Sequence, residues 1–210
     1  LYNKYEQDNM YNKRVSSREL WYRILDSQME TGTPYLLYKD ACNKKSNQQN
    51  IGVIKSSNLC TEIVEYSDSK ETAVCNLASI ALPSFVDPEK KTFNYEKLHN
   101  VTKVITKNLN RLIELNFYPT EKTSYSNQQH RPIGIGVQGL ADTFILLDIA
   151  FHSEEAKEIN KNIFETMYHG ALERSCELSK EFGSYNSFAG SPLEQGKFQF
   201  DMWGVEASDR

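Results

Sequence analysis

Residues 131–148 read RPIGIGVQGLADTFILLD, a pattern that predicts a short strand, a glycine turn and a helix in succession. Long helical patterns flank this unit, and several apolar segments before it are short enough to be strands. Strands that are mixed with long helices in this way are typical of α/β proteins. We therefore expect an α/β fold.

The glycines of this stretch, Gly134, Gly136 and Gly139, fit the pattern G-x-G-x-x-G of dinucleotide-binding turns. Such a site also needs an acidic residue about 20 positions further on, at the end of a second strand. Glu158 stands near that offset but falls within a predicted helix, and the strand before the glycines is very short. We reject dinucleotide binding and expect the glycines to permit a tight turn and close helix–strand contact.

Capping residues and apolar spacing predict three long helices. Ser16 and Glu19 form a capping-box pattern before an apolar stripe, and Gly32 ends that helix. Apolar residues recur at helical spacing over residues 98–112, and a third helix is expected over residues 153–183.

The remaining segments are predicted to be extended or irregular. Extended segments are expected at residues 34–38, 51–54 and 58–66, and residues 72–82 could form a strand or a helix. Polar loops, turns and linkers are expected at residues 42–50, 67–70, 120–130 and 187–210.

The composition is ordinary for a globular protein and excludes several classes of function. The chain has 210 residues, of which 39% are hydrophobic and 25% charged, and its formal net charge is −4. No basic surface for nucleic-acid backbones and no apolar run of membrane-spanning length is predicted. Because the chain starts at Leu1 without an apolar signal region, we expect an internal piece of a longer protein.

Cysteine and histidine spacing does not predict a metal centre. The four cysteines are expected to be reduced thiols. Cys42 could be reactive in its polar loop, although an inert buried thiol is favoured, and Cys176 is expected to pack in a helix. The four histidines are scattered, and no Cys-x-x-Cys pattern accompanies them, so a zinc site is not expected.

Asn58, Cys60 and Glu62 occupy alternate positions in the sequence SSNLCTEI. If this segment is extended, an amide, a thiol and a carboxylate face one side, where they could contact one ligand. The competing interpretation is a half-exposed strand with an incidental cysteine, and spacing alone slightly favours it.

The two cysteine segments, SNLCTEI at residues 57–63 and AVCNLAS at residues 73–79, resemble the active-site segments of the large subunit of class I ribonucleoside-diphosphate reductases. Residues 20–50, RPIGIGVQGLADTF and FQFDMW resemble the eukaryotic form of that subunit in the same order. The resemblance covers essentially the whole chain. It implies that residues 1–210 are a fragment of the catalytic domain, a ten-stranded α/β barrel in which a central finger loop carries Cys60.

The resemblance also implies chemical roles. Cys60 corresponds to the cysteine that becomes a thiyl radical and takes the 3′-hydrogen of the ribose. Glu62 corresponds to the general base at the 3′-hydroxyl, and Asn58 to the amide that holds the ribose hydroxyls; Leu59 belongs to the same substrate-binding segment. Cys75 corresponds to one half of the dithiol that supplies two electrons.

The resemblance implies partners as well. These are a ribonucleoside diphosphate substrate, a small subunit whose di-iron centre supplies the radical, thioredoxin or glutaredoxin as reductant, and a second large subunit in a dimer. ATP and deoxynucleotide effectors are expected to bind outside the chain, which itself holds no cofactor, and a cytoplasmic location is expected.

Several parts of the family's active site are expected to lie outside this chain. The family's second redox cysteine lies far upstream, and Cys42 stands in the wrong place for it. The phosphate-binding loop, the radical-transfer tyrosines and the C-terminal cysteine pair lie further downstream in the family. The fragment alone is therefore expected to be inactive, and the alternative is a non-catalytic structural or partner-binding piece in which Cys60 and Cys75 are core thiols.

Overall fold

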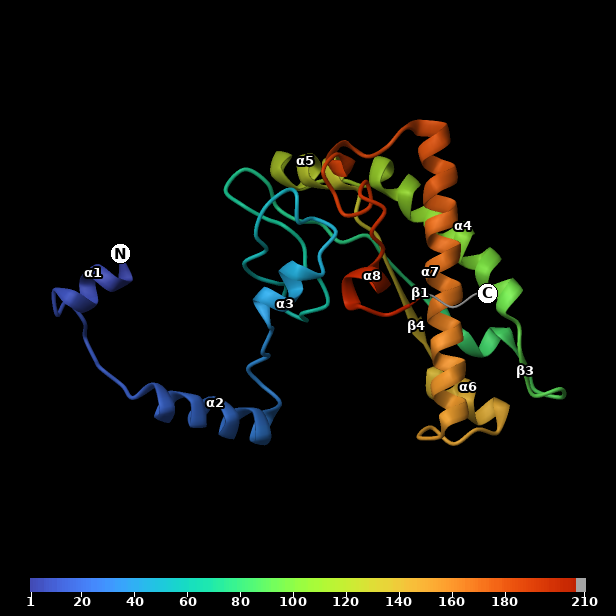
Figure 1. Cartoon of the computed structure of the whole chain (residues 1–210), viewed down its shortest axis with the longest axis horizontal. Helices are drawn as coiled ribbons and strands as arrows, with labels where there is room; N and C mark the ends of the chain where they lie inside the picture. Colours follow the sequence, from blue (N-terminus) through green and yellow to red (C-terminus); the bar gives the residue numbers. More distant parts are fainter. Residues whose placement is uncertain (207–210) are drawn as a thin grey trace.

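A computed structural model of the chain describes residues 1–206 (Figure 1). In chain order the elements are α1 (Tyr2–Gln7), α2 (Ser17–Thr31), α3 (Lys39–Lys44), β1 (Leu77–Ala81), the 3₁₀ helix η1 (Leu82–Phe85), β2 (Val86–Asp87), β3 (Thr92–Phe93), α4 (Tyr95–Leu115), α5 (Glu121–His130), β4 (Gly134–Gln138), α6 (Leu140–Leu147), α7 (Glu154–Phe182), the 3₁₀ helix η2 (Asn186–Phe188) and α8 (Gln199–Trp203).

The strands β1 and β4 form a parallel pair in which Leu77 lies opposite Gly134 and Ala81 opposite Gln138. The helices α4 and α5 connect the two strands, which makes the unit a βαβ crossover. The predicted α/β class and the predicted strand, turn and helix at residues 131–148 are therefore confirmed. Residues 1–206 hold four strands, because β2 and β3 add a short antiparallel pair, so the ten-stranded barrel stays a prediction.

Gly134 and Gly139 lie in close contacts, as expected from the sequence, whereas a Cβ atom on Gly136 would make only an ordinary contact, 3.6 Å from Ser79 Oγ. A Cβ atom on Gly134 would lie 2.6 Å from the Leu77 side chain, and one on Gly139 would lie 2.8 Å from the Pro83 ring. Gly139 also has a φ of +72°, which an L side chain rarely adopts. Position 139 therefore needs glycine, because of its backbone conformation and the rigid Pro83 ring, whereas at Gly134 the flexible end of the Leu77 side chain could move aside.

The hydrophobic core lies where α4 and α7 pack together beside β1. Leu98 from α4 and Ile163 from α7 are fully buried, and each contributes about 1.5–3 kcal/mol relative to exposure. Thr102 and Thr106 are buried on the same face of α4, where each hydroxyl donates to the carbonyl four residues earlier, at 2.8 and 2.9 Å. Burial therefore leaves neither hydroxyl without a partner.

Residues 120–130 were predicted to be a polar linker, and this prediction is wrong. They form α5, which Thr120 caps through a reciprocal contact with Thr123. The helix buries a polar face, including Ser126 and Asn127. The sequence therefore has no apolar stripe from which the helix could be predicted.

The extended segments predicted at residues 34–38, 51–54 and 58–66 are not strands, and residues 42–44 belong to α3 rather than to a loop. Side chains satisfy the backbone there in place of a neighbouring strand. Asn43 Oδ1 accepts from the amide of Ile54, and Gln48 Oε1 accepts from the amide of Tyr66. Once side chains take these donors, no strand ladder is needed to satisfy them.

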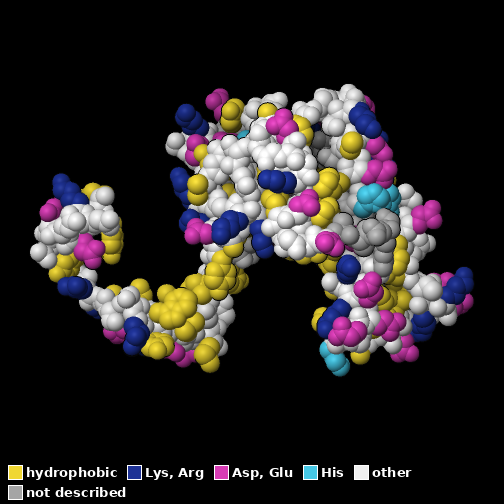
Figure 2. All heavy atoms as spheres, viewed as in Figure 1, with side chains coloured by type: hydrophobic (Ala, Val, Ile, Leu, Met, Phe, Trp, Pro, Cys, Tyr) yellow, Lys and Arg dark blue, Asp and Glu magenta, His cyan; other side chains and the backbone are white. Residues whose placement is uncertain are grey.

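The helices α1 and α2 lie apart from the rest of the structure, as an arm at the N-terminus (Figure 1). The predicted bounds of α2 are confirmed, since Ser16 precedes it and Gly32 ends it in the left-handed conformation, but the Ser16 side chain makes no capping bond. Hydrophobic side chains gather on the surface of the arm (Figure 2), and α2 buries none of its residues.

Candidate active site around Cys60 and Cys75

The segment that carries Cys60 is a turn and not an extended strand. The amide of Thr61 donates to the carbonyl of Asn58 at 3.2 Å, and Thr61 has a φ of +66°. Leu59 and Cys60 thus occupy the two central positions of the turn. The prediction that alternate positions of an extended strand align these side chains is wrong.

The turn nevertheless brings the two polar residues around Cys60 together. Asn58 Nδ2 donates to Glu62 Oε1 at 2.6 Å, and Asn58 Oδ1 accepts from the amide of Ile63 at 3.1 Å. The amide of Asn58 therefore orients the Glu62 carboxylate and closes the base of the loop. A carboxylate held in this way can accept a proton from a hydroxyl placed beside it.

Cys60 and Cys75 are both exposed free thiols. Leu59 is 91% exposed, so the tip of the turn carries no core residue. The alternative in which Cys60 and Cys75 are core thiols does not fit this exposure. Cys176 is also exposed, which corrects the prediction that it packs inside its helix, and Cys42 is only partly buried.

Cys75 is followed directly by the most constrained polar residue of the site, Asn76. Asn76 Nδ2 donates to Asn127 Oδ1 at 2.7 Å and to the carbonyl of Pro132 at 2.8 Å, while Asn127 Nδ2 donates back to Asn76 Oδ1 at 3.2 Å. Both side chains are buried, and the Asn76 carbonyl accepts from the amide of Gly134. Loss of one partner would leave a buried amide unsatisfied, which costs about 1–3 kcal/mol.

A second buried contact precedes Cys75. His130 Nε2 donates to Glu71 Oε2 at 2.7 Å, and the two side chains are 8% and 9% exposed. His130 Nδ1 lies 2.9 Å from Ser187 Oγ, which also donates to the carbonyl of Gln129. The line of serine, histidine and glutamate resembles a hydrolase triad, but in this structure it connects three chain segments, and we interpret it as a structural contact.

Glu65 is a carboxylic acid whose surroundings disfavour its charge. Burial raises the pKa of Glu65 from its ordinary value of 4.5 to about 7. Glu65 lies three residues after Glu62, on the segment that links the Cys60 turn to Cys75. The protonation of this segment therefore changes close to neutral pH.

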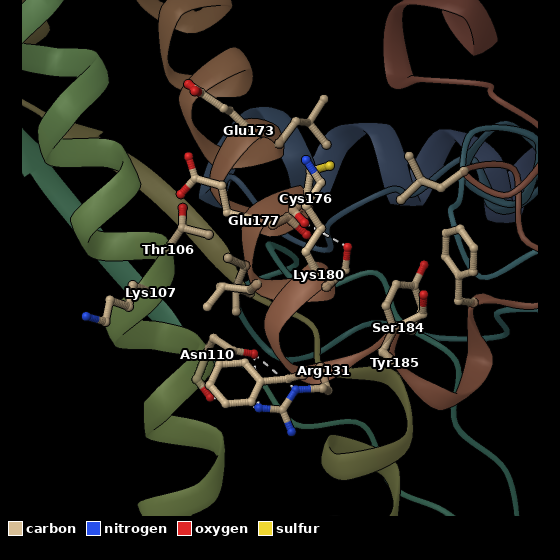
Figure 3. A pocket seen from close by; sticks show the side chains of 18 of the residues that line it. Thr106, Lys107, Asn110, Arg131, Glu173, Cys176, Glu177, Lys180, Ser184 and Tyr185 are labelled. Carbon is tan, nitrogen blue, oxygen red and sulfur yellow. Dashed lines mark hydrogen bonds between the residues drawn. The ribbon is translucent and has the colours of Figure 1, made fainter.

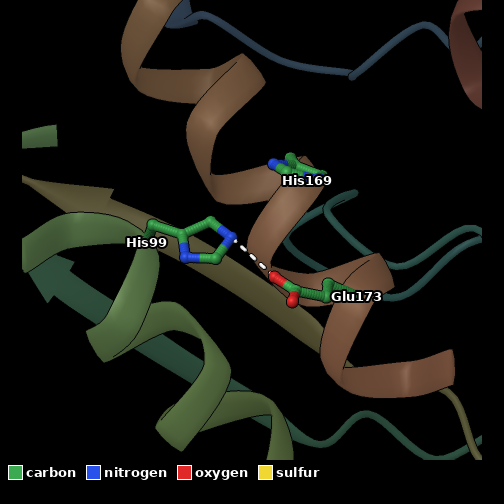
Figure 4. Close-up of side chains that lie close together, drawn as sticks. All are labelled: His99, His169 and Glu173. Carbon is green, nitrogen blue, oxygen red and sulfur yellow. Dashed lines mark ion pairs between the residues drawn. The ribbon is translucent and has the colours of Figure 1, made fainter. Parts of the chain in front are cut away.

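His99, His169 and Glu173 form a cluster that sequence spacing did not reveal (Figure 4). Their nearest ligand atoms lie within 4.8 Å of one another, and two imidazoles with a carboxylate are a donor set that zinc accepts. His169 and Glu173 are four residues apart on α7, a spacing visible in the sequence, whereas His99 comes from α4.

In this cluster the ammonium group of Lys103 balances the negative charge of the carboxylates, as a zinc ion would. Its ammonium lies 3.0 Å from Glu173 Oε1 and 2.6 Å from Glu177 Oε1, while His99 Nε2 lies 2.9 Å from Glu173 Oε2. The hydrogen bond from Lys103 lowers the pKa of the Glu173 carboxyl. We interpret the cluster as an ion-pair network that joins α4 to α7.

A hollow of about 1810 Å³ lies elsewhere (Figure 3). It is bounded by α4, α5, α7 and residues 183–200, and none of its lining residues comes from residues 1–105. Among its charged lining residues, Arg131 donates to Asn110 and Glu114. The hollow therefore does not include the candidate cysteine site.

An exposed thiol on a turn and a second exposed thiol just before β1 define an α/β protein with a candidate cysteine-based redox site. Comparison with known families is consistent with this class. Residues 1–210 match the family model of the ribonucleotide reductase barrel domain, and the chain therefore belongs to the ribonucleotide reductase family.

Several relatives are similar over the whole chain. The large subunit of ribonucleoside-diphosphate reductase from Plasmodium falciparum is 59% identical over 210 residues, which are 100% of this chain and 26% of that protein. The large subunit from Danio rerio is 58% identical, with 100% of this chain and 26% of that protein covered. The chain thus spans about a quarter of the length of these relatives.

A solved structure is similar in fold. The alpha subunit of the class Id ribonucleotide reductase of Actinobacillus ureae superimposes with a TM-score of 0.70 at 29% identity. The match covers 86% of this chain and 34% of that one. Among residues 1–206, no helix has the length and apolar character needed to cross a membrane.

The raised pKa of Glu65 predicts that stability falls as pH rises. Between about pH 4.5 and pH 7 the folded state binds more protons than the unfolded state, so the free energy of unfolding decreases over this window. Glu65→Gln removes the ionisation, and we expect it to raise the unfolding temperature at pH 8 much more than at pH 4.5. Thermal unfolding at both pH values measures this difference.

The exposed Glu89→Gln serves as the matched control and should shift the unfolding temperature equally at the two pH values. An equal effect of Glu65→Gln at pH 4.5 and pH 8 would contradict the assignment.

Proposed function

We propose that this chain is the part of a large ribonucleotide reductase subunit that carries the radical cysteine and one of the two redox thiols. The longer protein would reduce ribonucleoside diphosphates to 2′-deoxyribonucleoside diphosphates, the precursors of DNA. The proposal rests on one observation above all. In a chain of this family, the Asn58–Glu62 contact closes the turn that exposes Cys60.

Cys60 is the proposed hydrogen-abstracting group. The small subunit supplies the radical equivalent when the two subunits are assembled. A thiol suits the abstraction because its S–H bond is close in strength to an activated ribose C–H bond, so hydrogen transfer from C3′ is nearly balanced. The exposed position of Cys60 at the tip of a turn lets the sulfur approach a sugar without moving core residues.

Glu62 and Asn58 are the proposed groups for the ribose hydroxyls. The Glu62 carboxylate would accept the proton of the 3′-hydroxyl, since an ionised carboxylate is an acceptor only. Asn58 keeps that carboxylate in place through a 2.6 Å hydrogen bond, and its amide could exchange this partner for a ribose hydroxyl. Leu59 would line the same substrate segment.

Cys75 is the proposed electron donor together with a second thiol outside residues 1–210. The two thiols lose two electrons and two protons and form a disulfide, while the ribose loses its 2′-hydroxyl as water. The overall reaction converts a ribonucleoside diphosphate and a dithiol into a deoxyribonucleoside diphosphate, a disulfide and water. Thioredoxin or glutaredoxin would then reduce the disulfide.

The resemblance extends the proposal to the surroundings of the site. The parallel β1–β4 pair would be two strands of a ten-stranded barrel, with the Cys60 turn as its central finger loop. The enzyme would be a cytoplasmic dimer of large subunits with ATP and deoxynucleotide effector sites elsewhere. The isolated chain is expected to be inactive because the second thiol, the radical-transfer tyrosines and the phosphate loop belong to other segments.

Serine substitutions in the full-length subunit test the two cysteine roles. Cys60→Ser should abolish deoxynucleotide formation, because the serine O–H bond is too strong to be broken by the incoming radical, so no hydrogen-abstracting radical forms at position 60. Cys75→Ser should block normal product formation while still permitting the first hydrogen abstraction. Product formation with the small subunit and a dithiol measures both effects.

Cys176→Ser is the matched control, since Cys176 is an exposed thiol away from both segments, and its turnover should stay within about twofold of wild type. Multiple turnover at the wild-type rate in Cys60→Ser would refute the proposed function.

Glu62→Gln tests the proposed base separately from the fold. The substitution preserves the shape of the side chain but removes the proton acceptor, so kcat should fall by about 10²–10⁴-fold. Because the ribose hydroxyls can still be held by Asn58, KM should change much less. Steady-state kinetics would contradict the role of Glu62 if only KM increased and kcat were unchanged.

A further inference from the structure

The segment that carries Cys75 is fixed at both ends to one helix. Glu71 contacts His130 and Asn76 contacts Asn127, so the two buried contacts bracket residues 72–75. Asn127 and His130 are three residues apart on α5, about 4.5 Å along the helix axis, and therefore lie on the same face.

The first turn of α5 contributes a third connection. Lys122 Nζ donates to the carbonyl of Ser69 at 2.6 Å, and the carbonyl of Lys122 accepts from the amide of Thr72 at 3.3 Å. The helix itself is fixed to α4, because Arg131 donates to Asn110 and Glu114. The backbone on either side of Cys75 therefore has little freedom to move relative to α4 and α5.

We propose that Asn127 and His130 are positioning residues for the Cys75 thiol: by holding Asn76 and Glu71, they keep the sulfur in the geometry needed for disulfide formation. The inference rests on the proposed function of Cys75. Asn127 acts through Asn76, and His130 acts through Glu71.

The burial pattern supports a positioning role. Asn76 is 2% exposed and Asn127 is fully buried, whereas Cys75 between the two contacts is exposed. The reactive group is thus accessible while the residue beside it is fixed. This arrangement suits thiol–disulfide chemistry, because a disulfide forms only when the two Cβ atoms come within about 3.5–4.5 Å.

Removal of either contact should slow the oxidation of Cys75 and leave substrate affinity unchanged. A displacement of about 1 Å can reduce the rate of a positioned reaction by about a hundredfold. We therefore expect Asn127→Ala and His130→Ala to slow the formation of the Cys75 disulfide at least about tenfold, with KM for the ribonucleoside diphosphate within about twofold of wild type.

The test uses the full-length large subunit assembled with its radical-bearing small subunit. The enzyme is first reduced, the external reductant is removed, and one turnover is started with a ribonucleoside diphosphate. Differential alkylation followed by peptide mass analysis then gives the fraction of Cys75 in a disulfide at each time point. Steady-state kinetics on the same variants give KM and kcat.

Conservative variants separate positioning from loss of the fold. His130→Gln keeps a side-chain amide that can donate to Glu71, and its oxidation rate should return to within about threefold of wild type. Asn127→Asp keeps the acceptor for Asn76 but loses the donor, so we expect a slower rate than wild type even if Asn127→Ala fails to fold. Gln128→Ala, an exposed amide on the same helix, should match wild type.

The outcomes distinguish this inference from the proposed function. If wild-type enzyme oxidises Cys75 during turnover and Asn127→Asp, Asn127→Ala and His130→Ala do so at the same rate, the positioning role is overturned and the function stands. Equal slowing by Gln128→Ala would also overturn it. If wild-type enzyme forms product while Cys75 stays reduced, both the function and the positioning role are overturned.

Discussion

The reciprocal hydrogen bonds between the side-chain amides of Asn76 and Asn127 connect the Cys75 segment to helix α5, and the candidate site depends on this contact. The Asn76 side chain ties the end of the Cys75 segment to α5, and its carbonyl begins the hydrogen bonding between β1 and β4. Both side-chain amides are buried, so their donors and acceptors must find partners within the protein. The two side chains therefore need the orientation that lets each donate to the other. Asn76 therefore takes part both in the pairing of β1 with β4, through its main chain, and in fixing the Cys75 segment to α5, through its side chain.

The two candidate cysteines are held in different ways that match different tasks. Cys60 sits at the tip of a turn that Asn58 and Glu62 close together with a hydrogen bond from Ser57 Oγ to the Ile63 carbonyl, so the proposed substrate groups are part of its surroundings. Cys75 stands beside a buried residue on a segment fixed at both ends. A group that meets a substrate benefits from partners that can be exchanged, whereas one half of a dithiol needs a fixed distance to its partner.

Features with a local cause could be predicted from the sequence. The strand, glycine turn and helix at residues 131–148 follow from glycine geometry and apolar spacing, and Gly32 ends α2 as expected. The helix α5 could not be predicted because its buried face is polar, and Asn127 has a partner 51 residues away. The prediction of strands at the extended segments was wrong for a similar reason. Side chains such as Asn43 and Gln48 accept the backbone N–H hydrogen bonds that a neighbouring strand would otherwise accept.

The central claim is that Cys60 and Cys75 have separate roles, radical chemistry and electron supply. Disulfide mapping of the full-length enzyme after one turnover without external reductant tests this claim most directly. We expect Cys75 to be joined to a cysteine outside residues 1–210 and Cys60 to remain a free thiol. A dominant disulfide between Cys60 and Cys75 would contradict it.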